Sequence, residues 1–449
     1  MGKTINKFVC SQCGYEAPKW LGKCPGCFSW NTLIEEIVEK RASIKTIKRV
    51  EAVALNNIAH DAGYRFSSGI KELDRVLGGG IVPGSLIMMG GDPGVGKSTL
   101  LLQVADSIAQ TGQKVIYLSG EESLKQIKLR SIRLGIESDL IYLLNEQNID
   151  LMSEYIKEIN PGVVIIDSIQ TVYSHNMDSI PGSLSQLREC TARVMKIAKE
   201  TEKAFILIGH VTKDGILAGP KVIEHMVDVV VSFEGDKNTS FRILRGIKNR
   251  FGATDEIGLL EMSTKGLIEV LNPSSIFISA NEANINGTAV AAGFEGSRPL
   301  MVEVQALVSL SKPGYARRMA SGIDQNRLSL IIAVLEKRAY NLAVNDVYLK
   351  ITGGVFLRDP SIDLAIAAAI VSSYREYSLP LDTVFAGELS LSGQIRPVPF
   401  LDMRLKEAEK LGYNKAVIPA NIGNTSVFSS INLIKVSNID DFIDLIMEG

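Results

Sequence analysis

Short and almost wholly apolar runs recur through the middle of the chain. Each run is bounded by Gly-rich turns or amphipathic segments, and the runs lie at 86–90, 114–119, 163–167, 204–209 and 227–233. Runs of this length predict buried strands. Residues 98–110 and 184–200, which lie between some of these runs, repeat apolar residues at helical spacing. This alternation predicts an α/β domain with a mainly parallel sheet.

The pattern changes on both sides of this region. Residues 1–30 are rich in Cys, Trp and Gly and short of aliphatic residues, so they cannot build a hydrophobic core of their own. After about residue 272 a second α/β block follows, with expected helices at 325–340 and 361–373 and strands at 347–352 and 415–419. We therefore expect four segments, which are a small domain at 1–30, a linker at 31–65, an α/β domain at 66–272 and another at 273–449.

Composition adds a local charge asymmetry. The 449 residues are 46% apolar and 22% charged, with a formal net charge of −2, which is typical of a globular protein and gives no overall basic field. Residues 1–50 nevertheless carry nine Lys or Arg against four Glu. No segment reaches the roughly 18 uninterrupted apolar residues of a membrane span, and residues 1–10 lack the apolar core of a signal peptide. We expect a cytoplasmic protein with no membrane partner.

Four of the five cysteines form two CxxC pairs near the N-terminus, separated by ten residues. They are Cys10, Cys13, Cys24 and Cys27. Two redox pairs or a chance arrangement are the alternatives, but four thiolates at this spacing can close a tetrahedral Zn²⁺ site. We predict a structural zinc whose binding energy folds the segment.

A phosphate-binding motif follows the first predicted strand and precedes a helix. Its residues are Gly91, Asp92, Pro93, Gly94, Val95, Gly96, Lys97, Ser98 and Thr99. The pattern GxxxxGK[ST] in this context predicts an ATP site, in which backbone amides surround the phosphates and Lys97 reaches the β- and γ-phosphates. Ser98 offers its hydroxyl to Mg²⁺. We expect the Lys97 ammonium to be solvated when no nucleotide is bound.

Acidic residues at the ends of two later strands complete the predicted site. Asp167 ends the apolar run 163–166 and is expected to hold Mg²⁺ through water. Glu121 and Glu122 follow the strand 115–119, and Glu121 is our first candidate for the base that orients water, with Glu122 second. A solvated acidic turn is the alternative. His210 ends another strand and is either a sensor of the γ-phosphate or a structural residue.

The chain resembles the RadA (Sms) family of bacterial DNA repair proteins. The resemblance rests on three features in this order, which are the four-cysteine cluster, the P-loop core and the motif Lys-Asn-Arg-Phe-Gly at 248–252. The resemblance covers essentially the whole chain. It implies a zinc finger, a RecA-like ATPase core and a C-terminal domain similar to the Lon protease. It further implies a hexameric ring that binds single-stranded and branched DNA, hydrolyses ATP and drives branch migration alongside the recombinase RecA.

The hallmark motif leaves two roles open for Lys248 and Arg250. They could act on a neighbouring subunit's nucleotide, as an arginine finger does, or contact DNA phosphates. From spacing alone, a basic surface turn would be favoured. The RecA-like fold makes the loops 174–185 and 212–222 candidate DNA contacts. Lys213 and Lys221 lie in the second loop, whereas the first has no Lys or Arg.

The C-terminal segments 353–369 and 385–411 resemble the proteolytic domain of Lon, which uses a Ser–Lys dyad. Ser361 falls at the nucleophile position, but the lysine position falls at Asp402, although Arg404 and Lys406 lie nearby. A carboxylate cannot replace the amine base, so we disfavour the alternative of an ATP-dependent protease and expect Asp359 and Ser361 to cap a helix. A nucleotide switch without hydrolysis, or a DNA scaffold, is a third possibility, disfavoured by the intact Lys97, Glu121 and Asp167. The resemblance makes five basic residues of this domain candidate DNA contacts, namely Lys312, Arg317, Arg318, Lys337 and Arg338.

Overall fold

The computed structural model divides the chain into two compact units, Met1–Glu269 and Val270–Gly449. Each unit is described by itself. The residues that the structure describes are 4–39, 54, 65–177, 179–210, 221–235, 240–254, 256–270, 272, 274, 277–278, 285–311, 316–338, 340–354, 356–422 and 431–448.

The N-terminal segment forms a small antiparallel sheet in the order β2-β1-β3. Its strands are β1 (Thr4–Cys10), β2 (Glu16–Ala17) and β3 (Leu33–Glu39). The buried apolar cluster is small, with Cys10, Ala17, Cys24 and Leu33 at its centre, so two of its four members are cysteines. β3 pairs with β1 along its whole length and lies in the segment where we expected a linker.

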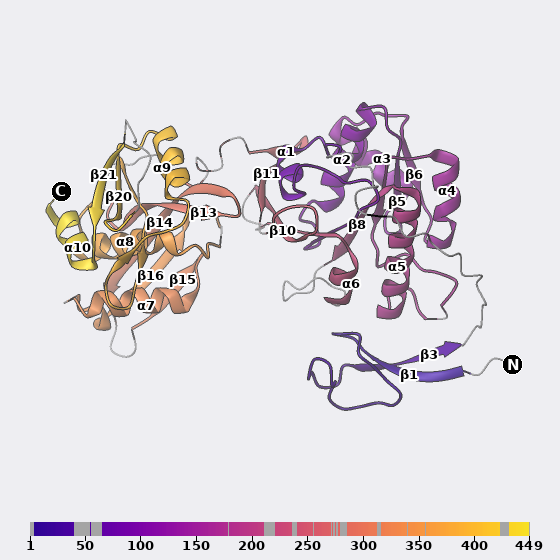
Figure 1. Cartoon of the computed structure of the whole chain (residues 1–449), viewed down its shortest axis with the longest axis horizontal. Helices are drawn as coiled ribbons and strands as arrows, with labels where there is room; N and C mark the ends of the chain where they lie inside the picture. The colour runs from indigo at the N-terminus through magenta and orange to yellow at the C-terminus, as the bar shows by residue number, and fades with distance from the viewer. Residues whose placement is uncertain are drawn as a thin grey trace. The chain divides into compact units, whose positions relative to one another are not determined.

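The α/β domain expected at 66–272 has a nine-stranded core sheet in the order β12-β11-β10-β9-β4-β8-β7-β5-β6. Its strands are β4 (Leu86–Gly91), β5 (Val115–Ser119), β6 (Ile141–Leu144), β7 (Val163–Asp167), β8 (Ala204–His210), β9 (Val229–Glu234), β10 (Phe241–Asn249), β11 (Ile257–Ser263) and β12 (Gly266–Glu269). The six strands from β4 to β9 are parallel, and β10 to β12 continue the sheet antiparallel. The mixed α/β fold with a parallel-rich sheet is thus confirmed (Figure 1).

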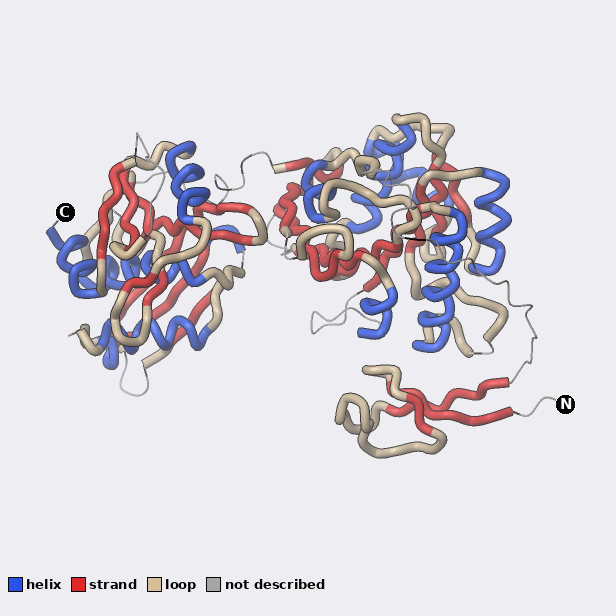
Figure 2. The backbone as a smooth tube through the Cα atoms, in the orientation of Figure 1, coloured by secondary structure: helices blue, strands red, loops and turns tan. Residues whose placement is uncertain are grey.

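Helices cover both faces of this sheet, because successive residues of each buried strand point to opposite faces. Ile87 and Met89 pack into one apolar cluster, and Leu86 and Met88 pack into the other. The helices are α1 (Lys71–Val76), α2 (Lys97–Gln110), α3 (Leu124–Leu134), α4 (Met152–Ile159), α5 (Leu184–Thr201) and α6 (Lys221–Met226), and Ile149–Leu151 is a 3₁₀ turn. Figure 2 shows the helices around the strands of this core.

The C-terminal unit has a seven-stranded mixed sheet in the order β15-β16-β14-β13-β17-β20-β21 and a hairpin of β18 and β19. The strands are β13 (Thr288–Glu295), β14 (Arg298–Leu310), β15 (Arg318–Ser321), β16 (Asn345–Ile351), β17 (Thr383–Phe385), β18 (Glu388–Leu389), β19 (Ile395–Arg396), β20 (Lys415–Pro419) and β21 (Asn432–Val436). The helices are α7 (Gln325–Glu336), α8 (Asp363–Arg375), α9 (Leu401–Lys410) and α10 (Ile439–Glu448), with 3₁₀ turns at Leu342–Val344, Thr352–Gly354 and Pro360–Ile362. The residues of α8 from Asp363 to Ser372 are all buried, so this helix is the centre of the unit.

Most predicted elements lie within a few residues of the observed ones. The predicted helix at 325–340 ends at Glu336, and the one at 361–373 begins as the 3₁₀ turn Pro360–Ile362 before α8. In the described part of the chain, no helix is both long and apolar enough to cross a membrane.

Candidate active site and metal centre

The P-loop joins the central strand β4 to α2 at the carboxyl edge of the parallel strands. Gly96 has φ +116°, a backbone conformation that side chains rarely allow, and a Cβ there would lie 2.7 Å from Met262 Cε. A Cβ on Gly91 would lie 2.3 Å from the carbonyl oxygen of Phe233. The two glycines are therefore required by close packing as well as by the turn. Between them, Asp92, Pro93 and Gly94 are exposed.

Lys97 is the first residue of α2 and is almost fully buried, with 5% exposure. Its Nζ donates to the carbonyl oxygens of Gly91 at 2.6 Å and Asp92 at 2.9 Å. Burial lowers the pKa of the ammonium, and the carboxylates of Asp167, Asp92 and Glu121 act in the opposite direction. The expectation that Lys97 is solvated was therefore wrong, because the loop's own carbonyls take the place of water.

Asp167 ends β7 beside the start of α2 and is buried. The hydroxyl of Tyr117, on the neighbouring strand β5, donates to Asp167 Oδ2 at 2.7 Å. Burial raises the pKa of the Asp167 carboxyl, and hydrogen bonds from Tyr117 and Ser98 partly offset that rise. Ser98 and Asp167 thus place two oxygen groups together, and oxygen is the ligand that Mg²⁺ prefers. Sequence reasoning missed Tyr117, which looks like an ordinary residue of an apolar strand.

The two candidate bases differ in their partners. Glu121 Oε1 accepts a short hydrogen bond from Ser168 Oγ, directly after Asp167, and the Glu121 charge acts on both Lys97 and Asp167. Glu122 instead forms an ion pair with Arg130 on α3, with Oε1 2.6 Å from Nη2. The Glu122 charge also acts on Asp167, but of the two only Glu121 acts on Lys97 as well, so Glu121 is the carboxylate more closely coupled to the P-loop site.

Lys248 and Arg250 lie near the amino ends of the parallel strands, whereas the P-loop of the same chain lies at their carboxyl ends. Antiparallel pairing aligns Asn249 with Val229, which in turn aligns with Ile87 near the start of β4. Arg250 is one residue further, and its amide donates to the carbonyl oxygen of Asp228. Because a strand rises about 3.3 Å per residue, Arg250 is about 17 Å along the sheet from Gly91.

Within the hallmark motif, Lys248 and Arg250 have different surroundings. Lys248 Nζ donates to the carbonyl oxygens of Glu224, His225 and Val227 at 2.7–3.2 Å, at the carboxyl end of α6. Arg250 is 52% exposed and pairs with the buried Asp228, with Nη1 3.2 Å from Oδ1. Lys248 is thus used inside the fold, whereas Arg250 reaches the surface.

The remaining residues of that motif also make internal contacts. Asn249 Nδ2 donates to the carbonyl oxygen of Val76, and Asn249 Oδ1 accepts from the amide of Phe251. A Cβ on Gly252 would lie 2.9 Å from the Cα of Gly78, so only glycine fits. The motif therefore holds Arg250 in place rather than presenting five surface residues.

Several other predicted residues lie wholly or partly outside the described part of the chain. Lys213 and Lys312 are outside it, and of His210 and Lys221 only the backbone is described. His210 aligns with Gly91 on the neighbouring strand. At the start of the first candidate DNA loop, Ser174 Oγ and the amide of His175 donate to Asp150, which lies in the 3₁₀ turn Ile149–Leu151.

The basic candidates of the C-terminal unit divide into two groups. Arg318 donates to the carbonyl oxygen of Leu342 at 2.6 Å, and Arg338 forms an ion pair with Asp440 at 2.7 Å. Arg317 and Lys337 are exposed. The first two therefore serve the fold, and the second two lie at the surface.

The four cysteine sulfurs of the N-terminal ribbon converge on one point. All four Sγ atoms lie within 4.8 Å of one another, and Cys10–Cys27 and Cys13–Cys24 are 3.6 and 3.4 Å apart. Zn–S bonds of about 2.3 Å in a tetrahedron place the sulfurs about 3.8 Å apart. The cluster fits Zn²⁺ and leaves no ligand position open. Cys190 is buried in α5 and lies apart from this cluster.

The Ser361 site of the C-terminal unit holds an arginine instead of a lysine. Ser361 is fully buried, and its Oγ lies 2.7 Å from Arg404 Nη1. The same nitrogen bonds the carboxylate of Asp359 and the carbonyl oxygen of Ala292. A guanidinium stays protonated in proteins and cannot accept the serine proton. Counting along the sequence pointed to Asp402, but the group that contacts Ser361 is Arg404, two residues later.

Asp359 caps the 3₁₀ turn Pro360–Ile362 by accepting from the amide of Ser361, as expected. Ser361 itself lies inside the turn and is not a cap. The cluster is a buried structural ion pair.

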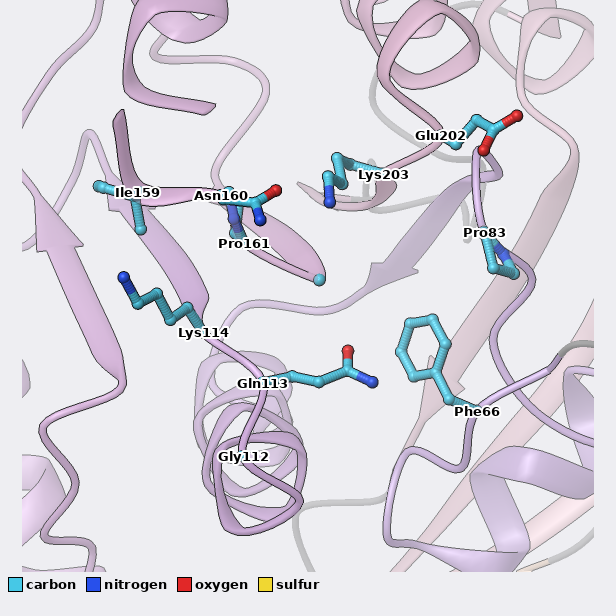
Figure 3. A pocket seen from close by; sticks show the side chains of 11 residues that line it. Phe66, Pro83, Gly112, Gln113, Lys114, Ile159, Asn160, Pro161, Glu202 and Lys203 are labelled. Atoms are coloured by element: carbon cyan, nitrogen blue, oxygen red, sulfur yellow. The ribbon is translucent and has the colours of Figure 1, made fainter. Parts of the chain in front are cut away.

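A separate cavity of about 480 Å³ lies at the amino edge of the core sheet, away from the P-loop. The carboxyl ends of α2, α4 and α5 border it through Gly112, Asn160 and Glu202. Figure 3 shows Lys114 and Lys203 among its lining side chains. None of the predicted site residues contributes to this cavity.

Family comparisons agree with these sites. The model of a rubredoxin metal-binding domain matches residues 8–35, the model of an AAA domain matches residues 59–216, and that of subunit ChlI of Mg-chelatase, a Lon-like domain, matches residues 331–422. The fold and the sites thus define a P-loop ATPase that binds ATP and Mg²⁺ and carries a four-cysteine Zn²⁺ site.

Curated relatives match the chain over nearly its whole length. DNA repair protein RadA of Halalkalibacterium halodurans is 49% identical, with 99% of each chain covered, and that of Bacillus subtilis is 48% identical over 100% of each. RadA of Streptococcus pyogenes serotype M1 is 46% identical, over 99% of this chain and 100% of its own. The chain belongs to the RadA family of DNA repair proteins, and its role is that of a DNA repair ATPase.

Proposed function

We propose that this ATPase binds single-stranded and branched DNA and drives branch migration of recombination intermediates alongside RecA. The observation that carries the proposal is the coupled group of Lys97, Asp167 and Glu121 at one edge of a RecA-like core. We further propose that it works in the cytoplasm as a homo-oligomeric ring, most simply a hexamer. We keep the segments expected from the sequence, a zinc finger at 1–30, a linker at 31–65, an ATPase domain at 66–272 and a Lon-like domain at 273–449, except that β3 extends the zinc finger to Glu39.

Each side chain of the site has a proposed role in hydrolysis. Residues 91–99 surround the nucleotide phosphates, and Lys97 exchanges its two carbonyl partners for phosphate oxygens. Ser98 and Asp167 hold Mg²⁺, which neutralises charge on the phosphates when it is bound. Glu121 orients the attacking water, supported by its hydrogen bond from Ser168. Glu122 is the weaker candidate because Arg130 already pairs with it.

Arg250 is proposed to act on another copy of the chain. Its position at the far edge of the sheet supports this, since about 17 Å separates it from the P-loop of its own chain. Its two possible targets are the neighbouring subunit's nucleotide and a DNA phosphate. Lys248 supports Arg250 from within the fold, and Lys213 and Lys221 remain proposed DNA contacts.

Phosphate release with and without single-stranded DNA tests the proposal. We expect DNA to stimulate the wild-type chain, and Glu121→Gln to abolish turnover while nucleotide binding persists. Glu122→Gln is the matched control and should retain most of the activity. Equal turnover with and without DNA, or a fully active Glu121→Gln chain, would contradict the proposal. Digestion of casein should be absent, because Arg404 cannot serve as the base for Ser361.

A further inference from the structure

Both tryptophans of the chain lie on one exposed surface of the zinc ribbon. Trp20 is 53% exposed, Trp30 is 70% exposed, and the neighbouring Phe28 is 68% exposed. The two indoles flank Gly22, because a Cβ on Gly22 would lie 3.6 Å from Trp20 and 3.7 Å from Trp30. Large apolar side chains gathered on a surface usually mark a binding site.

A lysine completes this surface. Lys23 Nζ lies 5.5 Å from the centroid of the Phe28 ring and 5.7 Å from that of the Trp30 ring. Cations at this distance from a ring face are attracted to its π-electrons. We call Trp20, Lys23, Phe28 and Trp30 the aromatic surface.

Backbone hydrogen bonds of the cysteine knuckle set the conformation of Phe28. The backbone of Phe28 has φ +61°, which is uncommon for a bulky residue. The Phe28 amide donates to the carbonyl oxygen of Cys24, and the Cys24 amide donates to that of Ser29, so the cysteine knuckle maintains this conformation. An unfavourable backbone conformation that keeps an aromatic ring in solvent suggests a function for the ring.

Charge favours a polyanionic partner. Residues 1–50 carry nine Lys or Arg against four Glu, and the stretch 17–34 that contains the aromatic surface has Lys19 and Lys23 and no Asp or Glu. Aromatic faces with neighbouring cations are the arrangement that binds unpaired bases without sequence preference. In a duplex the base faces are already stacked, so rings of this kind select single strands.

We infer that the aromatic surface of the zinc ribbon binds single-stranded DNA by stacking bases on Phe28, Trp30 and Trp20. Lys23 lies where it contacts the adjacent phosphates. This inference rests on the proposed function, since it names a part of the chain that holds the single strand. The ribbon would then bind single-stranded DNA independently of the ATPase core.

The placement of both tryptophans makes the inference directly measurable in the full chain. Oligo(dT) should quench the intrinsic tryptophan emission, while the anisotropy of a labelled oligo(dT) reports binding by the whole protein. Trp30→Ala should weaken binding about 5- to 150-fold, the range that corresponds to loss of one base–aromatic stack. Phe28→Gly should act similarly, and glycine suits the positive φ, so this variant keeps the fold.

Leu129→Ala is the matched control, because Leu129 is a large apolar side chain that is 69% exposed and belongs to α3 rather than to the ribbon. It should bind as the wild type does. All variants should keep their zinc and their ATP turnover without DNA. If labelled DNA binds but the emission is unchanged and both ribbon variants bind normally, the inference is overturned while the proposed function stands.

Two other outcomes would also overturn it. No binding of oligo(dT) by the wild-type chain would remove the proposed function together with the inference. If Trp30→Ala instead loses binding to a recombinase filament but keeps its affinity for free oligo(dT), the aromatic surface is a protein-docking site.

Discussion

At the scale of single residues, the P-loop site depends on buried polar groups that satisfy one another. Lys97 bonds two backbone carbonyl oxygens, and Tyr117 bonds Asp167. Buried charges are tolerated only when they are paired in this way. A substitution in the site should therefore change the free energy of unfolding as well as ATP turnover or nucleotide binding. Two variants test this.

Lys97→Ala should abolish ATP turnover because it removes the cation that faces the phosphates. It should also lower the free energy of unfolding by about 1–3 kcal/mol, since two carbonyl oxygens lose a buried partner. Phosphate release and urea denaturation measure the two effects. Lys114→Ala, at the opposite edge of the sheet, is the control and should keep its turnover. Wild-type turnover in Lys97→Ala would refute the assignment of the P-loop as the site of ATP hydrolysis.

Tyr117→Phe removes only the hydroxyl that donates to Asp167 and keeps the packing of the ring. A hydrogen bond to a charged group contributes about 1.5–3 kcal/mol, so Mg²⁺-dependent nucleotide binding should weaken about tenfold or more. Titration of a fluorescent nucleotide with and without Mg²⁺ measures this, and binding without Mg²⁺ should not change. Tyr142→Phe on β6 is the control. An unchanged response to Mg²⁺ would mean that Tyr117 only fills the core.

At the scale of elements, two small parts of the fold depend on contacts other than an apolar core. The ribbon buries few side chains, two of them cysteines. Helix α6 is six residues long and its carboxyl end is held by Lys248. Burial lowers the pKa of the Lys248 ammonium, as does the nearby charge of Arg250, while Asp228 and Glu224 act in the opposite direction. Lys248 therefore links α6 to β10, beside Arg250.

Cys24→Ala should release zinc and unfold the ribbon, because three ligands remain and the segment has little core of its own. The nine-stranded core has its own apolar clusters and should keep ATP turnover without DNA. Metal analysis and circular dichroism measure these outcomes. Cys190→Ala removes a buried cysteine outside the cluster and should keep its zinc. One zinc per chain in Cys24→Ala would contradict the assignment of Cys24 as a ligand.

At the scale of the whole molecule, Arg250 lies too far from the P-loop of its own chain to contact the nucleotide bound there. If Arg250 contacts a nucleotide, that nucleotide is bound by a second copy of the chain. Chains with Arg250→Ala and chains with Lys97→Ala would then each be inactive. Removal of such a finger typically reduces turnover by about 10³–10⁵. In mixed rings, an intact P-loop of the first variant lies beside an intact Arg250 of the second.

Mixing the two variants should therefore restore part of the turnover, measured as phosphate release at saturating DNA. Each variant mixed with itself is the control. If mixing restores nothing and Arg250→Ala hydrolyses ATP normally without DNA, Arg250 contacts DNA instead. Its loss should then reduce the salt slope of single-strand binding by about 0.7 for each lost phosphate contact.

Sequence patterns were enough to predict the strands β4, β5, β7, β8 and β9 of the core sheet, several helices and strands of the C-terminal unit, the P-loop and the cysteine cluster. These features depend on local patterns, such as buried runs between turns, glycines beside a lysine and paired cysteines, that persist whatever the chain does elsewhere. The strand at 163–167 and the one at 415–419 lie where the apolar runs predicted them.

Contacts between side chains from distant segments could not be predicted from these local patterns, because they depend on how the chain packs. The burial of Lys97, the bond from Tyr117 to Asp167 and the contact of Arg404 with Ser361 all depend on neighbouring strands and helices that are far apart in the sequence. The different surroundings of Lys248 and Arg250 have the same origin, because Lys248 lies in β10 against the end of α6, whereas Arg250 follows the last residue of that strand and pairs with Asp228. Lys248 bonds the backbone carbonyls at the carboxyl end of α6, and Arg250 lies at the surface.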